Sequence, residues 1–257
     1  MKAHPTAIVH PRAQVASSVT VGPYSLIGEN VELGEGTEVM SHAVIDGQTR
    51  IGKDNRIFPY ASIGLAPQDL KYGGEPTRVE IGDGNTLREF ITIHRGTGES
   101  GVTRIGDHNL LMAYVHIAHD CMIGNHVVMG NAASLAGHVE VQDFAIVEPF
   151  CGIHQYCRVG KYAFLGAYSV VNKDILPYSK MSAPRPVDMY GANTIGLERR
   201  GISKEEISEL QAALKLLSRS KLNTTQALEA IEARGFKSSH VRVLVEFIRT
   251  SQRGVAK

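Results

Sequence analysis

The chain has 257 residues, of which 27 are Lys or Arg and 26 are Asp or Glu, giving a formal net charge of +1. A chain of this length can bury a sizeable core, and balanced charge gives no bulk attraction to nucleic acid or to a membrane surface. Three cysteines are too few for a disulfide framework, and no apolar run reaches the length of a signal peptide or membrane span. We therefore predict a soluble, cytoplasmic protein with no nucleic-acid partner and no integral membrane association.

A six-residue repeat runs through the first two thirds of the chain. Every sixth residue from Val9 to Val171 is Ile, Leu, Val or Met, except at Asp69, Glu75 and Glu99. Glycine often follows the aliphatic residue, as expected where a turn needs positive φ or where two backbone segments approach closely. Short strands with one inward aliphatic residue and tight corners predict a parallel β-helix. Three repeats would close an 18-residue coil, so residues i and i+18 should stack.

The three exceptions fall in two polar, Gly-rich segments, residues 65–78 and 97–104. Because the repeat resumes in register after each segment, we predict two loops that project from the β-helix. Loops that interrupt a strict repeat are frequent functional sites, although a tolerated insertion is an equally good interpretation. We expect the β-helix to span residues 1–177.

The remaining chain is predicted to form a linker over residues 178–202 and a helical cap over residues 203–257. The spacing of Ser203 and Glu206 is that of a capping box, which begins the first helix. Asn223 begins a second helix, and Ser238 or Ser239 begins a third.

Several polar residues should gather at one corner of the β-helix. In an 18-residue coil His119 lies below Gly137 and then below Gln155. The whole predicted cluster consists of His116, His119, Asp120, Gly137, His138, His154 and Gln155. Any one of these histidines alone would most simply be a surface residue, but four in one place indicate a site.

Two chemistries could use this cluster. Zinc hydration requires three neutral imidazoles and an open coordination position. General-base catalysis requires one histidine, a residue that orients it and a donor for developing oxyanion charge. Here His119 could be the base, Asp120 or His138 could orient it, and the Gly137 N–H could face an oxyanion. The second arrangement uses more of the residues and suggests acyl transfer.

Longer motifs add a resemblance to a known family: QDLKYGGEPTRVEIGD (68–83), ITIHRGT (91–97), NLLM (109–112), HIAHDC (116–121), LAGHVEV (135–141), HQYC (154–157) and GLERRG (196–201). In these motifs the chain resembles the UDP-N-acetylglucosamine O-acyltransferases of lipid A biosynthesis. The resemblance implies a mainly β fold, a left-handed parallel β-helix with a small C-terminal α-helical domain. It also implies a homotrimer with active sites between subunits, and no metal or organic cofactor.

The same resemblance implies transfer of an (R)-3-hydroxyacyl group from acyl carrier protein to the glucosamine 3-hydroxyl of UDP-N-acetylglucosamine. It makes His119 the general base, Asp120 its orienting partner and Gly137 the oxyanion donor. Substrate contacts are expected at Gln68, Asp69, Lys71, His116, His138, His154, Gln155, Asn193, Arg199 and Arg200.

Some residues depart from the family pattern, and some alternatives stay open. Glu148-Pro149 replaces a usual Gly pair, and Ile195 stands where an acidic residue is common. Ala167 occupies the position that resembles the acyl-chain ruler. A related acyltransferase with an amine acceptor is the alternative enzyme. A purely structural solenoid would carry regular Thr or Asn ladders on its flat faces, and the sequence shows no such pattern.

Overall fold

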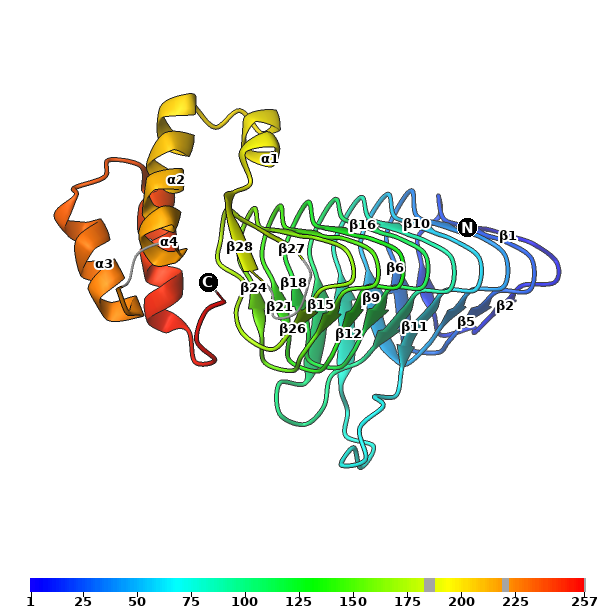
Figure 1. Ribbon diagram of the computed structural model, residues 1–257. Coiled ribbons are helices and arrows are strands. Elements are labelled where there is room, and N and C mark those ends of the chain that lie inside the picture. The colour runs from blue at the N-terminus through cyan, green and yellow to red at the C-terminus, as the bar shows by residue number, and fades with distance from the viewer. Residues whose placement is uncertain (183–187, 219–221, 257) are drawn as a thin grey trace.

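The computed structural model describes residues 1–182, 188–218 and 222–256, and consists of a stack of triangular coils followed by a group of helices (Figure 1). Three sheets of 11, 9 and 8 strands form the sides of the stack. We call them sheets A, B and C, with corner 1 between A and B, corner 2 between C and A, and corner 3 between B and C. All strand pairs are parallel except the last pair of sheet A, β27 with β28.

Most strands are only two residues long. Sheet A contains β1 (Lys2–Ala3), β4 (Thr20–Val21), β7 (Glu38–Val39), β10 (Arg56–Ile57), β13 (Thr86–Leu87), β16 (Leu110–Leu111), β19 (Val128–Met129), β22 (Ile146–Val147), β25 (Phe164–Leu165), β27 (Ser179–Ser182) and β28 (Asp188–Ala192). Sheet B contains β2 (Ile8–Val9), β5 (Leu26–Ile27), β8 (Val44–Ile45), β11 (Ser62–Leu65), β14 (Thr92–His94), β17 (His116–Ile117), β20 (Ser134–Leu135), β23 (Gly152–Ile153) and β26 (Val170–Val171). Sheet C contains β3 (Gln14–Val15), β6 (Val31–Leu33), β9 (Gln48–Ile51), β12 (Arg78–Ile81), β15 (Val102–Ile105), β18 (Met122–Ile123), β21 (Glu140–Val141) and β24 (Arg158–Val159).

The register confirms the predicted 18-residue coil. His116 pairs with Ser134, and Ser134 pairs with Gly152. The aliphatic repeat residues point inward and are buried from Val21 to Val171, because one side chain per strand must fill the narrow interior. Burial of these aliphatic columns, at about 25 cal/mol per Å² of apolar surface, drives formation of the stack.

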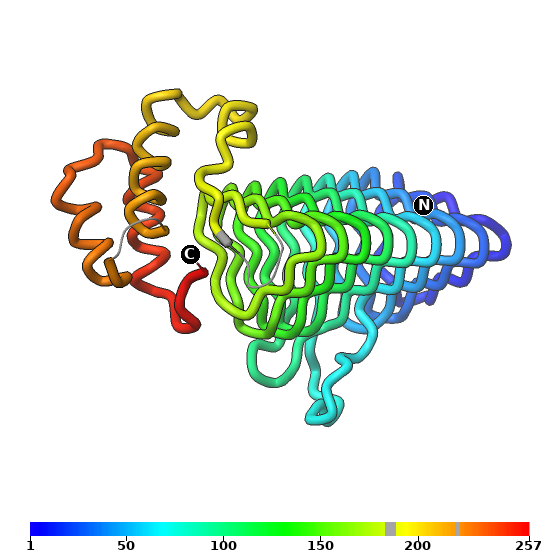
Figure 2. Tube along the Cα trace, in the orientation of Figure 1, coloured from blue at the N-terminus to red at the C-terminus, as the bar shows by residue number. Residues whose placement is uncertain are grey.

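The two loops leave the stack at the same corner. One joins β11 to β12, the other joins β14 to β15, and both project from corner 3 (Figures 1 and 2). The second is shorter than expected, because residues 102–105 already form β15. Both loops therefore adjoin the corner to which the sequence assigns the histidine cluster.

Of the two roles expected for the repeat glycines, positive φ or close backbone approach, the structure shows mainly close approach. Gly22 and Gly124 are needed for close approach, since a Cβ at Gly124 would lie 2.8 Å from the backbone N of Asp143. Positive φ occurs mainly at non-glycine residues such as Tyr114 and Phe144. Their rings stack on rings of adjacent coils, for example Phe90 on Tyr114 at 4.9 Å. Stacking worth about 0.5–1.5 kcal/mol per pair offsets a backbone cost of roughly 1–2 kcal/mol per residue.

An asparagine ladder, which the sequence interpretation missed, runs inside corner 2. Asn85 donates from its backbone N and its Nδ2 to Asn55 Oδ1, and the backbone N of Asn109 donates to Asn85 Oδ1. All three residues are buried, so the ladder lies in the interior and not on a flat outer face. It satisfies backbone groups at corners that the short strands leave unpaired.

The segment expected to be a linker contains regular structure. β27 adds to the end of sheet A, β28 pairs with it, and α1 (Thr194–Arg199) follows. The cap contains α2 (Lys204–Ser218), α3 (Thr224–Ala233) and α4 (Ser239–Thr250). Asn223 and Gln226 form a capping box, and Ser238 is the N-cap of α4. No helix in the described parts of the chain is both long and apolar enough to cross a membrane.

Candidate active site

His119 and Asp120 form a hydrogen-bonded pair at corner 3. His119 follows β17, and Asp120 occupies the positive-φ corner position. His119 Nδ1 lies 2.8 Å from Asp120 Oδ2, while the carboxylate is fully buried and the imidazole is 15% exposed. This contact favours a proton on Nδ1 and leaves the Nε2 lone pair free, which is the form a general base needs.

The loop between β14 and β15 supplies the other donors to Asp120. The backbone N of Thr97 donates to Oδ1 at 2.9 Å and Thr97 Oγ1 donates to Oδ2 at 2.7 Å, while Ser100 Oγ also donates to Oδ1. Burial alone raises the pKa of Asp120, but the hydrogen bonds from Ser100, Thr97 and His119 outweigh it and leave the pKa below its ordinary value. Asp120 is therefore held as a carboxylate.

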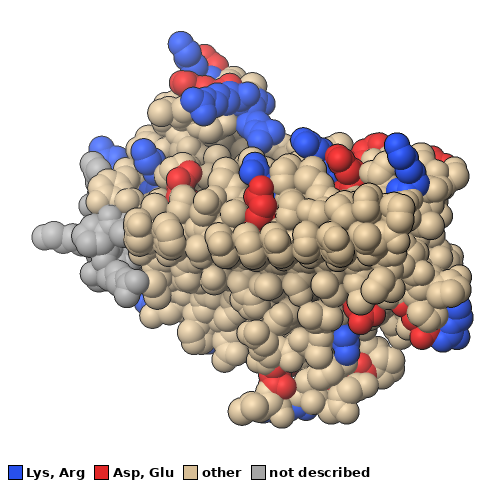
Figure 3. All heavy atoms as spheres, turned by 90° about the vertical axis from the view of Figure 1, so that its right-hand side faces the viewer, with Lys and Arg blue, Asp and Glu red and all other residues tan. Residues whose placement is uncertain are grey.

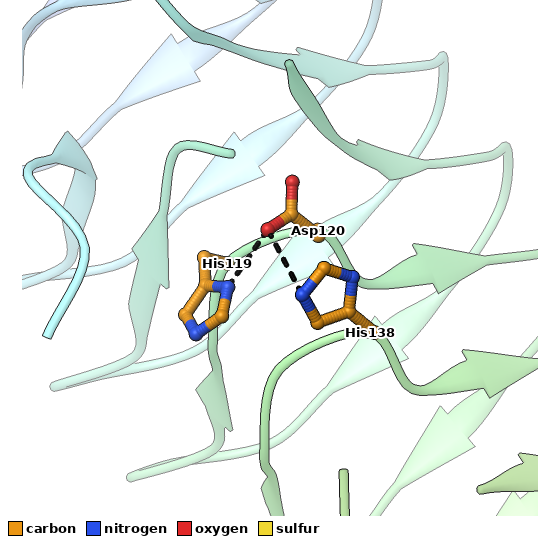
Figure 4. Close-up of side chains that lie close together, drawn as sticks. All are labelled: His119, Asp120 and His138. Carbon is orange, nitrogen blue, oxygen red and sulfur yellow. Dashed lines mark hydrogen bonds and ion pairs between the residues drawn. The ribbon is translucent and has the colours of Figure 1, made fainter. Parts of the chain in front are cut away.

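His138 lies one coil above this pair. Its Nε2 is 3.5 Å from Asp120 Oδ2, and its ring meets that of His119 edge to face with centroids 5.2 Å apart (Figure 4). On the other side it stacks on Tyr156 at 4.5 Å. Glu99, in the shorter loop, is 3.6 Å from His138 Nε2. The loop thus contacts both coils of the cluster.

Glycine at position 137 brings the backbone against His119. A Cβ there would lie 2.6 Å from His119 Nε2. Among the described residues the Gly137 N–H has no hydrogen-bond partner, whereas the N–H groups of Ala136 and His138 are both bonded. A free donor beside a free imidazole nitrogen is the combination that a tetrahedral oxyanion requires.

Two further histidines lie near this pair: His116 is on the same coil as His119, and His94 is on the preceding coil. His116 Nδ1 shares a hydrogen bond of 2.7 Å with Thr92 Oγ1, and burial followed by repulsion from His119 lowers its pKa. His94, which the sequence analysis did not select, packs edge to face on His116 at 5.2 Å. Burial, followed by repulsion from His116, lowers the pKa of His94 to about 4, and its buried Nδ1 has no hydrogen-bond partner in the described part of the chain. Its position at the end of β14, one 24-residue step below Ala118, could have identified it.

A metal ion is the other chemistry that the cluster could support. Ligand atoms of His119, Asp120 and His138 lie within 4.8 Å of one another. However, a carboxylate offers about four lone-pair directions, and Thr97, Ser100 and His119 already direct four donors at Asp120. The arrangement therefore fits an oriented imidazole better than a metal centre.

The remaining predicted residues are distributed over three places. His154 and Gln155 are exposed on the coil above His138. Gln68 and Lys71 have exposed side chains in the longer loop, where Asp69 Oδ1 accepts a hydrogen bond from the backbone N of Lys71 at 2.9 Å. That loop also projects from corner 3.

The α1 residues lie at a different corner from His119. Asn193 caps α1, and its Nδ2 donates to Tyr162 O at 3.1 Å. The guanidinium of Arg200 lies 4.7 Å from the centroid of Phe144 at corner 2, and Arg199 is exposed. One chain by itself does not bring Arg199 and Arg200 to the histidine cluster.

Comparisons with known proteins agree with this architecture. A family model described as UDP N-acetylglucosamine O-acyltransferase, domain 2, matches residues 174–256, and a bacterial transferase hexapeptide model (six repeats) matches residues 103–137. The acyl-[acyl-carrier-protein]--UDP-N-acetylglucosamine O-acyltransferase of Thermodesulfovibrio yellowstonii is 52% identical over 255 residues, with 99% of this chain and 98% of that relative covered. The enzyme of the same name from Halorhodospira halophila is 49% identical over equal coverage. The crystal structure of Francisella novicida UDP-N-acetylglucosamine acyltransferase superposes with a TM-score of 0.96 at 44% identity, covering 99% of this chain and 93% of that one.

The coiled sheets and the hexapeptide match define a bacterial-type hexapeptide transferase with a left-handed parallel β-helix. Two relatives share about half of their residues with this chain over nearly its whole length, and this sequence identity defines one family within the hexapeptide transferases. The chain belongs to the UDP-N-acetylglucosamine O-acyltransferases.

Proposed function

We propose that the chain transfers an (R)-3-hydroxyacyl group from acyl carrier protein to the 3-hydroxyl of the glucosamine of UDP-N-acetylglucosamine, the first step of lipid A biosynthesis. Family membership supports the reaction. The observation that carries the mechanism is the His119–Asp120 pair next to the free Gly137 N–H.

In the proposed reaction, His119 Nε2 takes the proton from the sugar hydroxyl as its oxygen attacks the thioester carbonyl. Asp120 stabilises the resulting imidazolium, and the Gly137 N–H donates to the tetrahedral oxyanion. Collapse breaks the carbon–sulfur bond, and the leaving thiolate takes the proton from His119. The products are an ester and a free thiol, so the thioester supplies the driving force.

An oxygen acceptor is favoured over an amine acceptor. The relatives at 52% and 49% identity are both named O-acyltransferases. A hydroxyl, unlike an amine, is a weak nucleophile at neutral pH and needs an oriented base, which His119 and Asp120 can supply.

We further propose a homotrimer in which each active site lies between two subunits. Corner 1 exposes a line of aromatic residues, Tyr24, Tyr60, Phe90, Tyr114, Phe150 and Tyr168. The face seen in Figure 3 has a broad region without Lys, Arg, Asp or Glu. Exposed apolar surface of this extent is typical of a subunit interface. A neighbouring subunit could bring its α1 arginines to the histidine cluster, where guanidinium groups would pair with the diphosphate.

A cytoplasmic location agrees with the cysteines, since Cys121, Cys151 and Cys157 are all free, as is usual in a reducing compartment.

Mass spectrometry of the product tests the reaction. Purified protein, UDP-N-acetylglucosamine and a series of (R)-3-hydroxyacyl carrier proteins should give an O-acylated sugar nucleotide. His119→Ala should lower the rate by about 10²–10⁴-fold, whereas His10→Ala, at a half-buried histidine on the first coil whose Nδ1 accepts from the backbone N of Arg12, should retain activity. No ester with any donor from folded wild-type protein would refute the proposal, and an N-acylated product from a 3-amino sugar would support the amine acceptor.

The same donor series tests the acyl-chain ruler. Ala167 is half-buried next to corner 1, and its methyl group would limit the space for an acyl chain relative to glycine. Ala167→Gly should shift the preferred donor toward a longer chain, and an unchanged preference would remove Ala167 from this role.

A further inference from the structure

The column of corner residues that contains His119 continues past the candidate active site and ends in a cation. Gly137, Gln155 and Lys173 follow His119 at successive 18-residue steps, and the paired strands of sheet B hold these coils in register. Gln155 and Lys173 are exposed. At about 4.8 Å per coil, Lys173 lies roughly 14 Å along the stack from His119.

A second cation reaches this end of the column from the C-terminal segment. Arg253 Nη2 lies 3.3 Å from Nδ1 of His154, the residue that precedes Gln155. Burial and the charge of Asp174 raise the pKa of the Cys157 thiol and Arg253 opposes this rise, so the guanidinium also lies close to Cys157.

The C-terminal segment is fixed where Arg253 crosses the corner. Before Arg253, Ser251 Oγ donates to Asp174 Oδ2 at 2.9 Å. After it, the backbone N of Asp174 donates to Gly254 O at 3.0 Å and the backbone N of Ala256 donates to Asp174 O at 2.9 Å. Bonds on both sides restrict where the arginine side chain can go.

Neither cation has an acidic partner among the residues that the structure describes. Within the described ranges, no carboxylate lies within ion-pair distance of Lys173 or Arg253. The adjacent Asp174 is 1% exposed and is bound by Arg158, whose Nε is 3.0 Å away from Oδ2. Lys173 and Arg253 are therefore two unpaired cations beside the His154 imidazole, and we call these three residues the rim. The guanidinium can donate two parallel hydrogen bonds to a phosphate group, and the ammonium can add a third.

We propose that Lys173, Arg253 and His154 bind a phosphate anion, the phosphodiester of the prosthetic arm on which acyl carrier protein presents its thioester. This inference rests on the proposed function. With the thioester at His119, an extended pantetheine chain leads along the column through Gln155 and brings the phosphodiester to the rim. The diphosphate of the sugar nucleotide is the other source of phosphate, and the arginines of α1 are the better candidates for it.

Donors with and without phosphate test the site. Thioesters of phosphopantetheine and of pantetheine should be compared in wild type, Lys173→Ala and Arg253→Ala. Each substitution should raise the KM for the phosphopantetheine thioester roughly tenfold, whereas the KM for the pantetheine thioester should change little. The kcat should also change little, because a phosphate contact stabilises the bound substrate and the transition state equally. Arg242→Ala is the matched control, since this α4 arginine bonds to Lys237 O in the cap.

Equal increases of KM for both thioesters would overturn the inference. An increase only in the KM for UDP-N-acetylglucosamine would also overturn it, because the cations would then bind the nucleotide. If the wild type makes no ester with any donor, the proposed function fails but the rim can still be tested. NMR titration of the His154 ring should then show tighter binding of phosphopantetheine than of pantetheine, and Arg253→Ala should abolish the difference. Equal binding of the two ligands would refute the site.

Discussion

The His119 ring occupies the space that any side chain at position 137 would need. A Cβ at Gly137 would lie 2.3 Å from His119 Cε1. Gly137→Ala should therefore displace the imidazole and lower kcat by about 10²-fold, since a displacement of about 1 Å can cost that much. Gly152→Ala is the matched control, because a Cβ at Gly152 meets nothing within 4 Å. Steady-state kinetics of both variants test this prediction. Equal kcat values for Gly137→Ala and Gly152→Ala would show that the His119 ring can move without loss of activity.

Protonation of His94 should destabilise the protein at mildly acidic pH. Burial lowers its pKa from 6.5 to about 4 in the folded state, so between these values the unfolded chain binds more protons. Stability is therefore complete above about pH 6.5 and is lost as the pH falls toward 4. His94→Gln should flatten this decline in Tm, whereas His42→Gln should not. Parallel Tm-versus-pH curves for wild type and His94→Gln would contradict the assignment.

At the scale of elements, the loop between β14 and β15 holds the catalytic carboxylate that we propose. Thr97 gives two hydrogen bonds to Asp120, and these bonds help keep its pKa low. Thr97→Val removes one donor at nearly constant shape, so the Asp120 pKa should rise and the carboxylate should be protonated at a higher pH. The acid limb of kcat/KM should then move to higher pH.

Ser100→Ala should move that limb in the same direction, because Ser100 Oγ also donates to Asp120. Thr20→Val, on the exposed side of sheet A, is the control for a threonine substitution of this kind. An acid limb that stays in place in both loop variants would mean that the loop does not determine the state of Asp120.

The six-residue period was sufficient to predict the β-helix, the coil length and the stacking of His119 below Gly137. The period could not reveal the strands of residues 179–192, because the 18-residue spacing is lost there: Phe164 pairs with Lys180, 16 residues on. Residues 183–187 of the predicted linker lie outside the described residues.

The arrangement of the candidate active site could be predicted only for residues that follow the six-residue repeat. His119, Asp120 and His138 stand at 18-residue spacing or next to it, and the structure brings them together. Thr97 and Ser100 lie in an irregular loop, so their spacing in the sequence does not predict that they contact Asp120. His94 is separated from the cluster by a lengthened coil, which hides it from an 18-residue search.

At the scale of the whole molecule, assembly should depend on corner 1. In solution the wild type should have three times the mass of the 27.9 kDa chain, as measured by light scattering. Phe90→Glu would place charge on the aromatic edge and should dissociate the trimer and abolish activity together. Val243→Glu, at an exposed apolar residue of α4, should do neither. A monomeric, active wild type would contradict both the trimer and the shared site.

A stack of parallel coils has no internal limit on its length, so its two ends decide whether molecules can add to one another. At the C-terminal end, β28 extends sheet A, Val255 bridges to Asp174, and α2 packs against β28 (Figure 1). At the N-terminal end, β1, β2 and β3 are the outermost strands of their sheets among the described residues. Endless head-to-tail polymerisation needs two open edges on every molecule. Because α2 packs against β28 at the C-terminal end, we expect the C-terminal segment to oppose such polymerisation.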